Sequence, residues 1–248
     1  MTPSLVSLLA QLDNAKSRLD AKLPLPRYTA SSLREKLNLD WIYHSNALAG
    51  NSHTLRETKV VLEGIAVGGK KIAEPLDILC HRNAIHYIEN RVAQNIPLTA
   101  QTLEDLHHIL QTFDHKTRTK TPAAEKIRDL LAQRDTLCDT LPVVHPLIRA
   151  AHWHALFIRQ SPFPGDNGRL ARLLLNYDLL LAGYPAAIIF CTEKPQYIAA
   201  LKQAATSCDA LAILIANATL RTLHTMLALL GPSDPALSSS SSSQSAKP

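Results

Sequence analysis

Apolar residues recur at three- and four-residue spacing along almost the whole chain, whereas runs in which apolar and polar residues alternate are almost absent. The first pattern puts apolar side chains on one face of a helix, and alternation is what a half-buried strand would need. Proline and glycine lie between the apolar runs, at Pro97, Pro142, Gly183 and Gly231, where they end helices. The sequence therefore predicts an all-α protein.

The spacing predicts ten helices and leaves one short segment with the character of a strand, Ala187–Phe190. The expected helices are Pro3–Lys22, Ser31–Ala47, Thr54–Gly64, Glu74–Gln94, Ala100–Thr112, Pro122–Thr136, His145–Gln160, Asn167–Ala182, Lys194–Ser207 and Asp209–Leu230. We expect three parts: an N-terminal helix and linker over 1–30, a helical domain over 31–230, and a flexible tail rich in serine and proline over 231–248.

Composition narrows the class of protein. The 248 residues are 46% hydrophobic, which is enough for a sizeable core. The net charge of +5 is spread along the chain and aromatic residues make up only 5%, so nucleic-acid binding is not indicated. The four cysteines form no C-x-x-C pair, so we expect reduced thiols in a cytoplasmic protein. No apolar run is expected to be long enough to span a bilayer, so no membrane partner is predicted.

The stretch 160–172, QSPFPGDNGRLAR, interrupts one expected helix and begins another near Asn167. The N-terminus of a helix presents unpaired N–H groups and partial positive charge, both of which suit a phosphate. Gly168 would let the backbone approach closely, and Arg169 and Arg172 lie three residues apart on one helix face. Two guanidinium groups in that position could clamp a polyphosphate. The alternative is a tight turn capped by Asp166 or Asn167, with two exposed arginines.

The loop resembles the signature of the Fic family, His-Pro-Phe-x-(Asp/Glu)-Gly-Asn-Gly-Arg-x-x-Arg. Further segments resemble family segments in the expected order and extend the resemblance over about residues 30–205. These segments are YHSNALAGNSHTLRETKVVLEG, GGKKIAEPLDILCHRNAIHYI, VVHPLIRAAHWHALFI and LARLLLNYDLLLAGYPAAII. The resemblance implies a Fic-type helical bundle with a phosphate-binding loop between two central helices. It also implies use of ATP and Mg²⁺ to transfer AMP to a hydroxyl side chain of a target protein.

Six positions of the signature are retained in this chain: Pro162, Phe163, Asn167, Gly168, Arg169 and Arg172. The resemblance implies that Asn167 and Arg169 hold the α- and β-phosphates and that Arg172 reaches toward the γ-phosphate. Three positions depart from the signature. Ser161 stands where the family has its catalytic histidine, Gly165 stands at the acidic magnesium ligand, and Asp166 stands at the following glycine.

Loss of the histidine removes the general base that would accept the proton of the target hydroxyl. A serine hydroxyl does not titrate near neutrality, and general-base catalysis typically contributes about 10²–10⁴-fold in rate. The nearest upstream histidine, His154, lies about 10 Å away along the same expected helix at about 1.5 Å per residue. We therefore expect Ser161 to leave little transfer activity.

Asp166 could still offer a carboxylate to Mg²⁺, but from a backbone position one residue late. Magnesium requires near-octahedral oxygen ligands at about 2.0–2.1 Å, so this displacement should weaken the metal site. Asp166 also adds a side chain and a negative charge where the family's glycine lets phosphate approach. We expect nucleotide binding to be weakened as well.

The stretch SNALAGN, 45–51, resembles the family's inhibitory helix, in which a Ser or Thr is followed four residues later by Glu and then Gly. That Glu pairs with the second signature arginine, here Arg172. The corresponding residues are Ser45, Ala49 and Gly50, and a methyl group forms no ion pair. We therefore expect Arg172 to be free of this inhibition. The same stretch is also typical of an ordinary helix end.

A shortened segment, FDHKTRTKT over 113–121, replaces the β-hairpin that aligns the target in the family. The leading hypothesis is therefore a degenerate Fic protein acting as a nucleotide-binding or interaction module. The alternative is an active adenylyltransferase with a divergent motif, without the inhibitory Glu, in which Asp166 or the substrate supplies the base. A third hypothesis is self-association through the apolar stretch LLLNYDLLLAGY. The alternative interpretation of this stretch is a helix buried in the core.

Two pairs of histidines invite an interpretation as metal ligands: His107 with His108, and His152 with His154. Neither pair has the spacing of a helix-borne zinc motif, so solvated or core histidines are expected.

Overall fold

The computed structural model describes residues 2–111, 124–140 and 144–230. These residues form ten α-helices and one short 3₁₀ helix, in agreement with the predicted all-α class. The elements are α1 (Pro3–Asp20), α2 (Arg27–Leu48), α3 (Leu55–Leu62), α4 (Ala73–Ala93), α5 (Ala100–Leu110), α6 (Ala124–Thr140), α7 (Pro146–Gln160), α8 (Asn167–Leu181), η1 (Cys191–Glu193), α9 (Lys194–Gln203) and α10 (Asp209–Leu229). The tail from residue 231 and the segment 112–123, which contains the shortened flap, lie outside the described residues.

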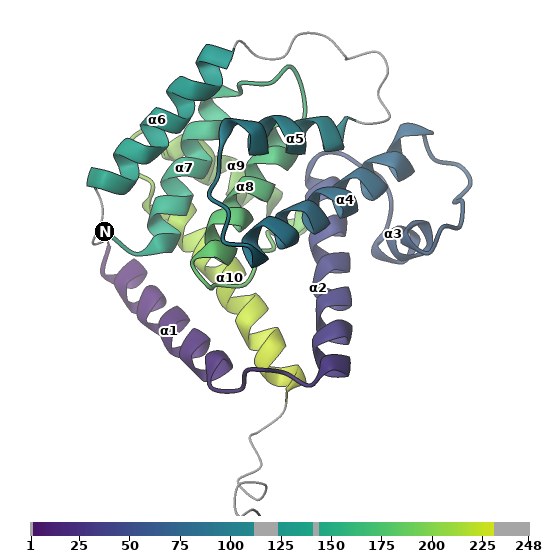
Figure 1. The fold of residues 1–248 in the computed structure, drawn as a ribbon, viewed down its shortest axis with the longest axis horizontal. Coiled ribbons are helices and arrows are strands. Elements are labelled where there is room, and N and C mark those ends of the chain that lie inside the picture. Colours follow the sequence, from purple (N-terminus) through teal and green to yellow (C-terminus); the bar gives the residue numbers. More distant parts are fainter. Residues whose placement is uncertain (1, 112–123, 141–143, 231–248) are drawn as a thin grey trace, which may run out of the picture.

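Helix α8 lies at the centre of the fold and packs closely against α7, with α4 and α5 beside it (Figure 1). Ten of its fifteen residues are buried, which is consistent with the leucine-rich sequence of its second half. The stretch LLLNYDLLLAGY is therefore mainly a core helix, as the alternative to self-association predicted. The central position of α8 holds the loop that precedes it between α5, α4 and the end of α2.

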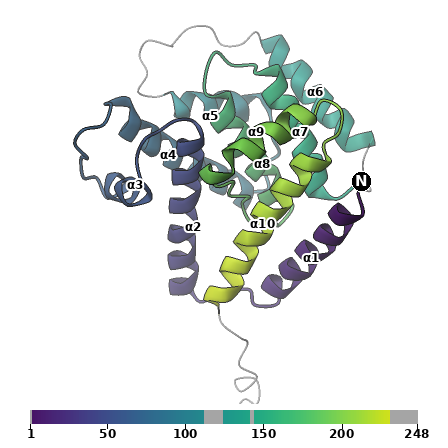
Figure 2. The ribbon, with the colours of Figure 1, turned by 180° about the vertical axis from the view of Figure 1, so that it is seen from behind.

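Helix α1 lies along α10, on the side of the molecule opposite to α3 (Figures 1 and 2). Leu5, Leu9 and Leu12 of α1 are buried in one apolar cluster with Leu211 and Ile215 of α10. Helix α10 in turn packs on α7, so this cluster continues toward the centre of the fold. A second cluster joins α2, α4, α5, α7 and α8 around Trp153, Phe157 and Phe163.

The predicted strand at 187–190 is wrong, because the described residues contain no strand. The segment runs beside helices, and side chains rather than a neighbouring strand bind its backbone. Asn176 accepts a hydrogen bond from the N–H of Ala187 at 2.8 Å, and Arg221 donates to the carbonyl of Ile188 at 2.9 Å. The apolar run is there because its side chains are buried in the core.

The expectation that no apolar run is long enough to span a bilayer is also wrong. Helix α10 has 21 residues and a mean hydropathy of 1.3, which is enough to cross a membrane by length and composition alone. Half of the apolar window of α10 is buried inside the protein, where the helix packs against α1, α7 and α9. The hydropathy of α10 therefore reflects its packing against neighbouring helices of the protein.

Helix α2 begins at Arg27, earlier than the predicted Ser31, with Pro26 as its N-cap. Ser31 and Ser32 lie exposed within the helix rather than at its start. Among the described cysteines, Cys80, Cys191 and Cys208 form no disulfide, as expected.

Candidate functional site

Ser161 ends helix α7 in a left-handed backbone conformation, with φ of 39°. Its N–H donates to the carbonyl of Phe157 at 2.9 Å, and its hydroxyl donates to the carbonyl of Ile158 at 2.7 Å. The side chain is exposed at the mouth of the loop. The residue at the position of the predicted base is therefore accessible, but its hydroxyl proton is already bonded to the helix that it caps.

The loop after Ser161 is held by Phe163 and Asn167. Phe163 is buried and stacks on the ring of His107 from α5, with 4.1 Å between ring centroids. The Asn167 amide bonds to the backbone of Phe163 twice, accepting from its N–H at 3.0 Å and donating to its carbonyl at 2.6 Å. In this structure Asn167, predicted to hold a phosphate, fixes the shape of the loop.

Asp166 is the N-cap of α8 and has φ of 59°, a left-handed conformation that favours glycine. Its side chain does not cap the first turn of the helix. Instead, Asp166 Oδ1 accepts a hydrogen bond from Arg169 Nε at 2.8 Å and a second from the Nη2 atom of the same guanidinium. The first-turn N–H groups of α8 thus have no side-chain cap and remain suited to an anion.

Arg169 is only 6% exposed and is surrounded by acceptors from three elements. Besides the two bonds to Asp166, its Nη1 atom lies 2.8 Å from Asp77 Oδ1 of α4 and donates to Asn46 Oδ1 of α2 at 3.2 Å. Asp77 and Asn46 were not singled out from the sequence. No motif spacing connects either residue to the loop, because the fold alone brings these helices together.

Burial by itself disfavours the charge of Arg169, but the nearby Asp166 and Asp77 outweigh it, and the pKa of Arg169 is raised. For Asp77 the balance is reversed. Burial is the largest influence on this half-buried carboxyl, and Asp166 and Glu74 add like charge, so its pKa is raised in spite of Arg169. The distance of 2.8 Å between Arg169 Nη1 and Asp77 Oδ1 is that of a charge-assisted hydrogen bond, so the two groups form an ion pair.

Arg172 is buried and bonded to the end of α2, although Ala49 offers it no carboxylate. Its Nε donates to the Ser45 hydroxyl at 3.0 Å, and its Nη2 donates to the Ser45 carbonyl at 2.8 Å. Burial lowers the pKa of Arg172, and the Tyr197 hydroxyl beside it opposes that shift. The loss of the inhibitory Glu therefore does not leave Arg172 unengaged, and the residue that holds it is Ser45.

His154 cannot replace the missing histidine at the loop. It is buried, its Nδ1 donates to the carbonyl of Ala171 at 3.0 Å, and its Nε2 accepts from the Tyr197 hydroxyl at 2.7 Å. Burial lowers its pKa to about 4. Both ring nitrogens of this neutral imidazole are occupied inside the protein, so it is a structural histidine.

Two of the other histidines considered as metal ligands make contacts within the protein, and His108 is exposed. His107 packs on Phe163, and His152 Nδ1 donates to the carbonyl of Ile148 at 2.9 Å. No group of three metal-binding side chains occurs among the described residues. His81 of α4, which the sequence did not single out, is fully buried with neither ring nitrogen bonded, and burial and the two arginines lower its pKa.

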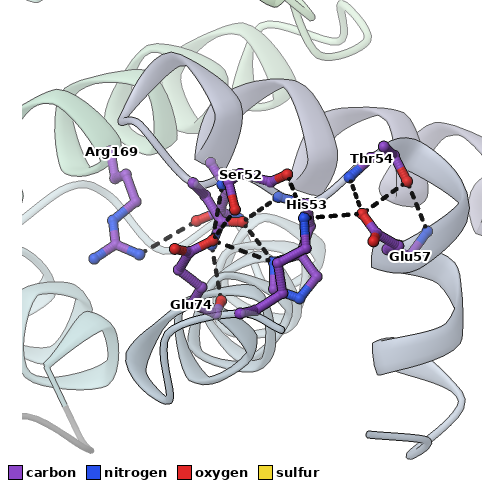
Figure 3. A network of polar contacts seen from close by, with 9 residues as sticks. Ser52, His53, Thr54, Glu57, Glu74 and Arg169 are labelled. Carbon is purple, nitrogen blue, oxygen red and sulfur yellow. Dashed lines mark hydrogen bonds and ion pairs between the residues drawn. The ribbon is translucent and has the colours of Figure 1, made fainter. Parts of the chain in front are cut away.

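The backbone that follows α2 is tied to the start of α4 by a polar network (Figure 3). Gly50 turns the chain with φ of 102°. Glu74 Oε2 then accepts from the Ser52 N–H at 2.9 Å and the Ser52 hydroxyl at 2.6 Å, and Asn51 donates to the Glu74 carbonyl at 2.8 Å. This network fixes the helix that carries Asp77 against the helix that carries Ser45 and Asn46.

The Fic/DOC family model matches residues 97–179, which include the loop and both arginines. The chain is 32% identical over 180 residues to "Protein adenylyltransferase Fic" of Nematostella vectensis, covering 66% of this chain and 42% of that protein. It is 31% identical over 212 residues to the protein of the same name from Drosophila erecta, covering 78% of this chain and 43% of that protein. The chain thus spans about two fifths of the length of these relatives.

Solved structures share the fold. Fic-1 from C. elegans superposes with a TM-score of 0.81 at 21% identity, covering 92% of this chain and 74% of that one. A Fic domain containing signaling protein from Bacteroides thetaiotaomicron superposes with a TM-score of 0.76 at 22% identity, covering 87% and 95%. The family match and the sequence relatives together place a Fic/DOC domain in this chain, over residues 97–179.

Proposed function

We propose that this protein is a nucleotide-binding Fic protein of the AMP-transferase type whose transfer chemistry is strongly impaired. The observation that carries the proposal is the contrast within one loop. Two buried arginines stand at the N-terminus of α8, while the residue at the base position is a serine whose hydroxyl donates to Ile158. The site keeps its means of binding phosphate and lacks a group that accepts a proton near neutral pH.

In the transfer reaction, a target hydroxyl oxygen bonds to the α-phosphorus of ATP, the bond to the bridging oxygen breaks, and diphosphate leaves. The hydroxyl proton must pass to a base. Ser161 cannot take it, and the carboxylate of Asp166 is engaged by Arg169. Little AMP transfer is therefore expected from the unmodified chain.

The residues fit a nucleotide better than they fit its metal. The first turn of α8, Arg169 and Arg172 could bind phosphate oxygens once they leave their present partners. When bound, Mg²⁺ would neutralise phosphate charge, and Asp166 is the carboxylate that would hold it. Both hydrogen bonds from Arg169 go to Oδ1 of Asp166, so Oδ2 is the oxygen that would bind the metal while Oδ1 stays paired with Arg169.

The test is incorporation of α-labelled ATP into cell lysate by the unmodified chain and by Ser161→His. We expect negligible labelling by the former and weak labelling by the latter, because the new imidazole leaves the magnesium carboxylate out of place. Changing Gly165-Asp166 to Asp-Gly in the Ser161→His background should increase labelling at least tenfold. Arg169→Ala in the same background is the control and should abolish it.

The active-enzyme alternative makes the opposite prediction. Robust labelling by the unmodified chain would reject the impaired site and would require a base other than Ser161. Strong labelling by Ser161→His alone would show that the missing imidazole is the only defect. A target protein in the lysate and a cytoplasmic location remain part of the proposal.

A further inference from the structure

Arg169 uses most of its hydrogen-bonding capacity within the protein. A guanidinium has five N–H groups, and Arg169 makes four contacts with them, two to Asp166 and one each to Asp77 and Asn46. A phosphate needs at least two of these donors for a bidentate pair. Binding of a nucleotide at Arg169 therefore has to displace a partner that is already present.

Asp77 is the partner best placed to be displaced. Asp166 belongs to the same loop and helix start as Arg169, whereas Asp77 reaches the guanidinium from a different element, α4, through a single oxygen at 2.8 Å. Its side chain is 35% exposed, so solvent can receive it when the pair opens. Among the described residues, Arg169 is the only ion-pair partner of Asp77.

Other negative charges surround Asp77. Asp166 and Glu74 both act on it as like charges. Glu74 cannot easily move away, because Ser52 binds its carboxylate through two hydrogen bonds. Arg169 is the cation paired with both Asp166 and Asp77, and an incoming phosphate would compete with these two carboxylates for it.

We propose that Asp77 is an anionic competitor of the nucleotide, which holds Arg169 in the unliganded protein and thereby sets the affinity of the site for phosphate. The inference rests on the proposed nucleotide-binding function. Removing the charge of Asp77 should release one donor of Arg169 and reduce repulsion of the phosphate at the same time. Asp77 is thus an affinity-determining residue of this chain, contributed by a helix outside the signature loop.

The first experiment measures ATP binding by titration calorimetry at low salt, with and without Mg²⁺, for the full chain and for Asp77→Asn. We expect Asp77→Asn to lower the Kd at least tenfold. The control is Asp20→Asn on α1, a helix that packs along α10, which removes the same charge from a pair with Lys16 and should change the Kd less than twofold. Equal effects of the two variants would overturn the proposal.

A second experiment needs no nucleotide. Phenylglyoxal modifies accessible guanidinium groups, and peptide mass spectrometry reports the rate at Arg169 itself. We expect several-fold faster modification of Arg169 in Asp77→Asn, with Asp20→Asn matching the unmodified chain. If no variant binds ATP but Arg169 becomes reactive in Asp77→Asn, the nucleotide function fails and the competing contact stands. If Arg169 becomes reactive only in Asp166→Gly, Asp77 is not the residue that holds it.

Discussion

Arg172 remains hydrogen-bonded to helix α2 although the carboxylate expected at position 49 is absent. The sequence places Ala49 where the family's inhibitory Glu would reach this arginine, yet the guanidinium remains buried against α2. Ser45, one turn earlier on that helix, supplies both a hydroxyl and a carbonyl. At the scale of the residue, the end of α2 still positions the second signature arginine, but with neutral acceptors.

Ser45→Ala tests this contact. Removing the hydroxyl leaves the Nε–H of a buried guanidinium without its acceptor, which typically costs about 1–3 kcal/mol. We expect the free energy of unfolding, measured by urea denaturation, to fall by that amount. Ser45→Thr keeps a hydroxyl and should retain most of the stability. Ser32→Ala, at an exposed position of the same helix, should change it by less than about 0.5 kcal/mol, and an equal loss in both alanine variants would contradict the assignment.

At the scale of the element, the helices α7, α8 and α9 are connected through one buried imidazole. His154 of α7 donates to the Ala171 carbonyl of α8 and accepts from the Tyr197 hydroxyl of α9. Tyr197 also lies beside Arg172. Because the imidazole can accept from Tyr197 only when Nε2 is unprotonated, this connection depends on pH.

The pKa of His154 is about 4 in the folded protein, below the ordinary value of 6.5, so the unfolded chain binds its proton more readily. Stability should therefore be constant above about pH 7 and fall as the pH drops from 6.5 toward 4. The gap in pKa corresponds to about 3 kcal/mol at most, at about 1.4 kcal/mol per pH unit. The measurement is the urea midpoint of the full chain at several pH values between 7.5 and 4.5.

The matched variants separate His154 from the other histidines. His154→Gln keeps a donor and an acceptor but does not titrate, so its stability should fall less steeply over this pH range. His44, His81 and His107, whose pKa values are also lowered, should leave a residual slope. His86→Gln, at an exposed position of α4, should match the unmodified chain. An unchanged slope in His154→Gln would exclude this histidine as a source of the pH dependence.

At the scale of the whole molecule, α1 is joined to the cluster that surrounds α10. Its apolar face is buried along the length of the helix rather than at one end, and α10 continues this contact to α7. The division at residue 30 between an N-terminal helix and a helical domain stays a prediction. The packing nevertheless gives it a direct test, because a helix that folds with the core must contribute to the stability of the whole.

Leu12→Ala should lower the free energy of unfolding by about 2–5 kcal/mol, because Leu12 is fully buried and its truncation leaves a cavity between α1 and α10. The transition should remain single and should coincide by circular dichroism and tryptophan fluorescence. Val6→Ala, at a side chain that is 51% exposed on the same helix, is the control and should have little effect. A separate transition for α1 would support the boundary at residue 30.

The sequence by itself determined the helices, the loop and its departures from the Fic signature. These features are local, since helical spacing, Pro and Gly positions and a motif of thirteen residues, 160–172, are all read from neighbouring positions. The same locality explains the error at 187–190, where an apolar run has the same composition whether its backbone pairs with a strand or with side chains such as Asn176.

Only the tertiary structure decided what the loop's side chains bind. Arg169 meets Asp77 and Asn46, and Arg172 meets Ser45, across distances in sequence that no motif spans. From the sequence, both arginines could be either exposed side chains or a clamp for phosphate. Burial makes the difference, because a buried guanidinium must find acceptors, and the acceptors within reach depend on which helices pack around α8.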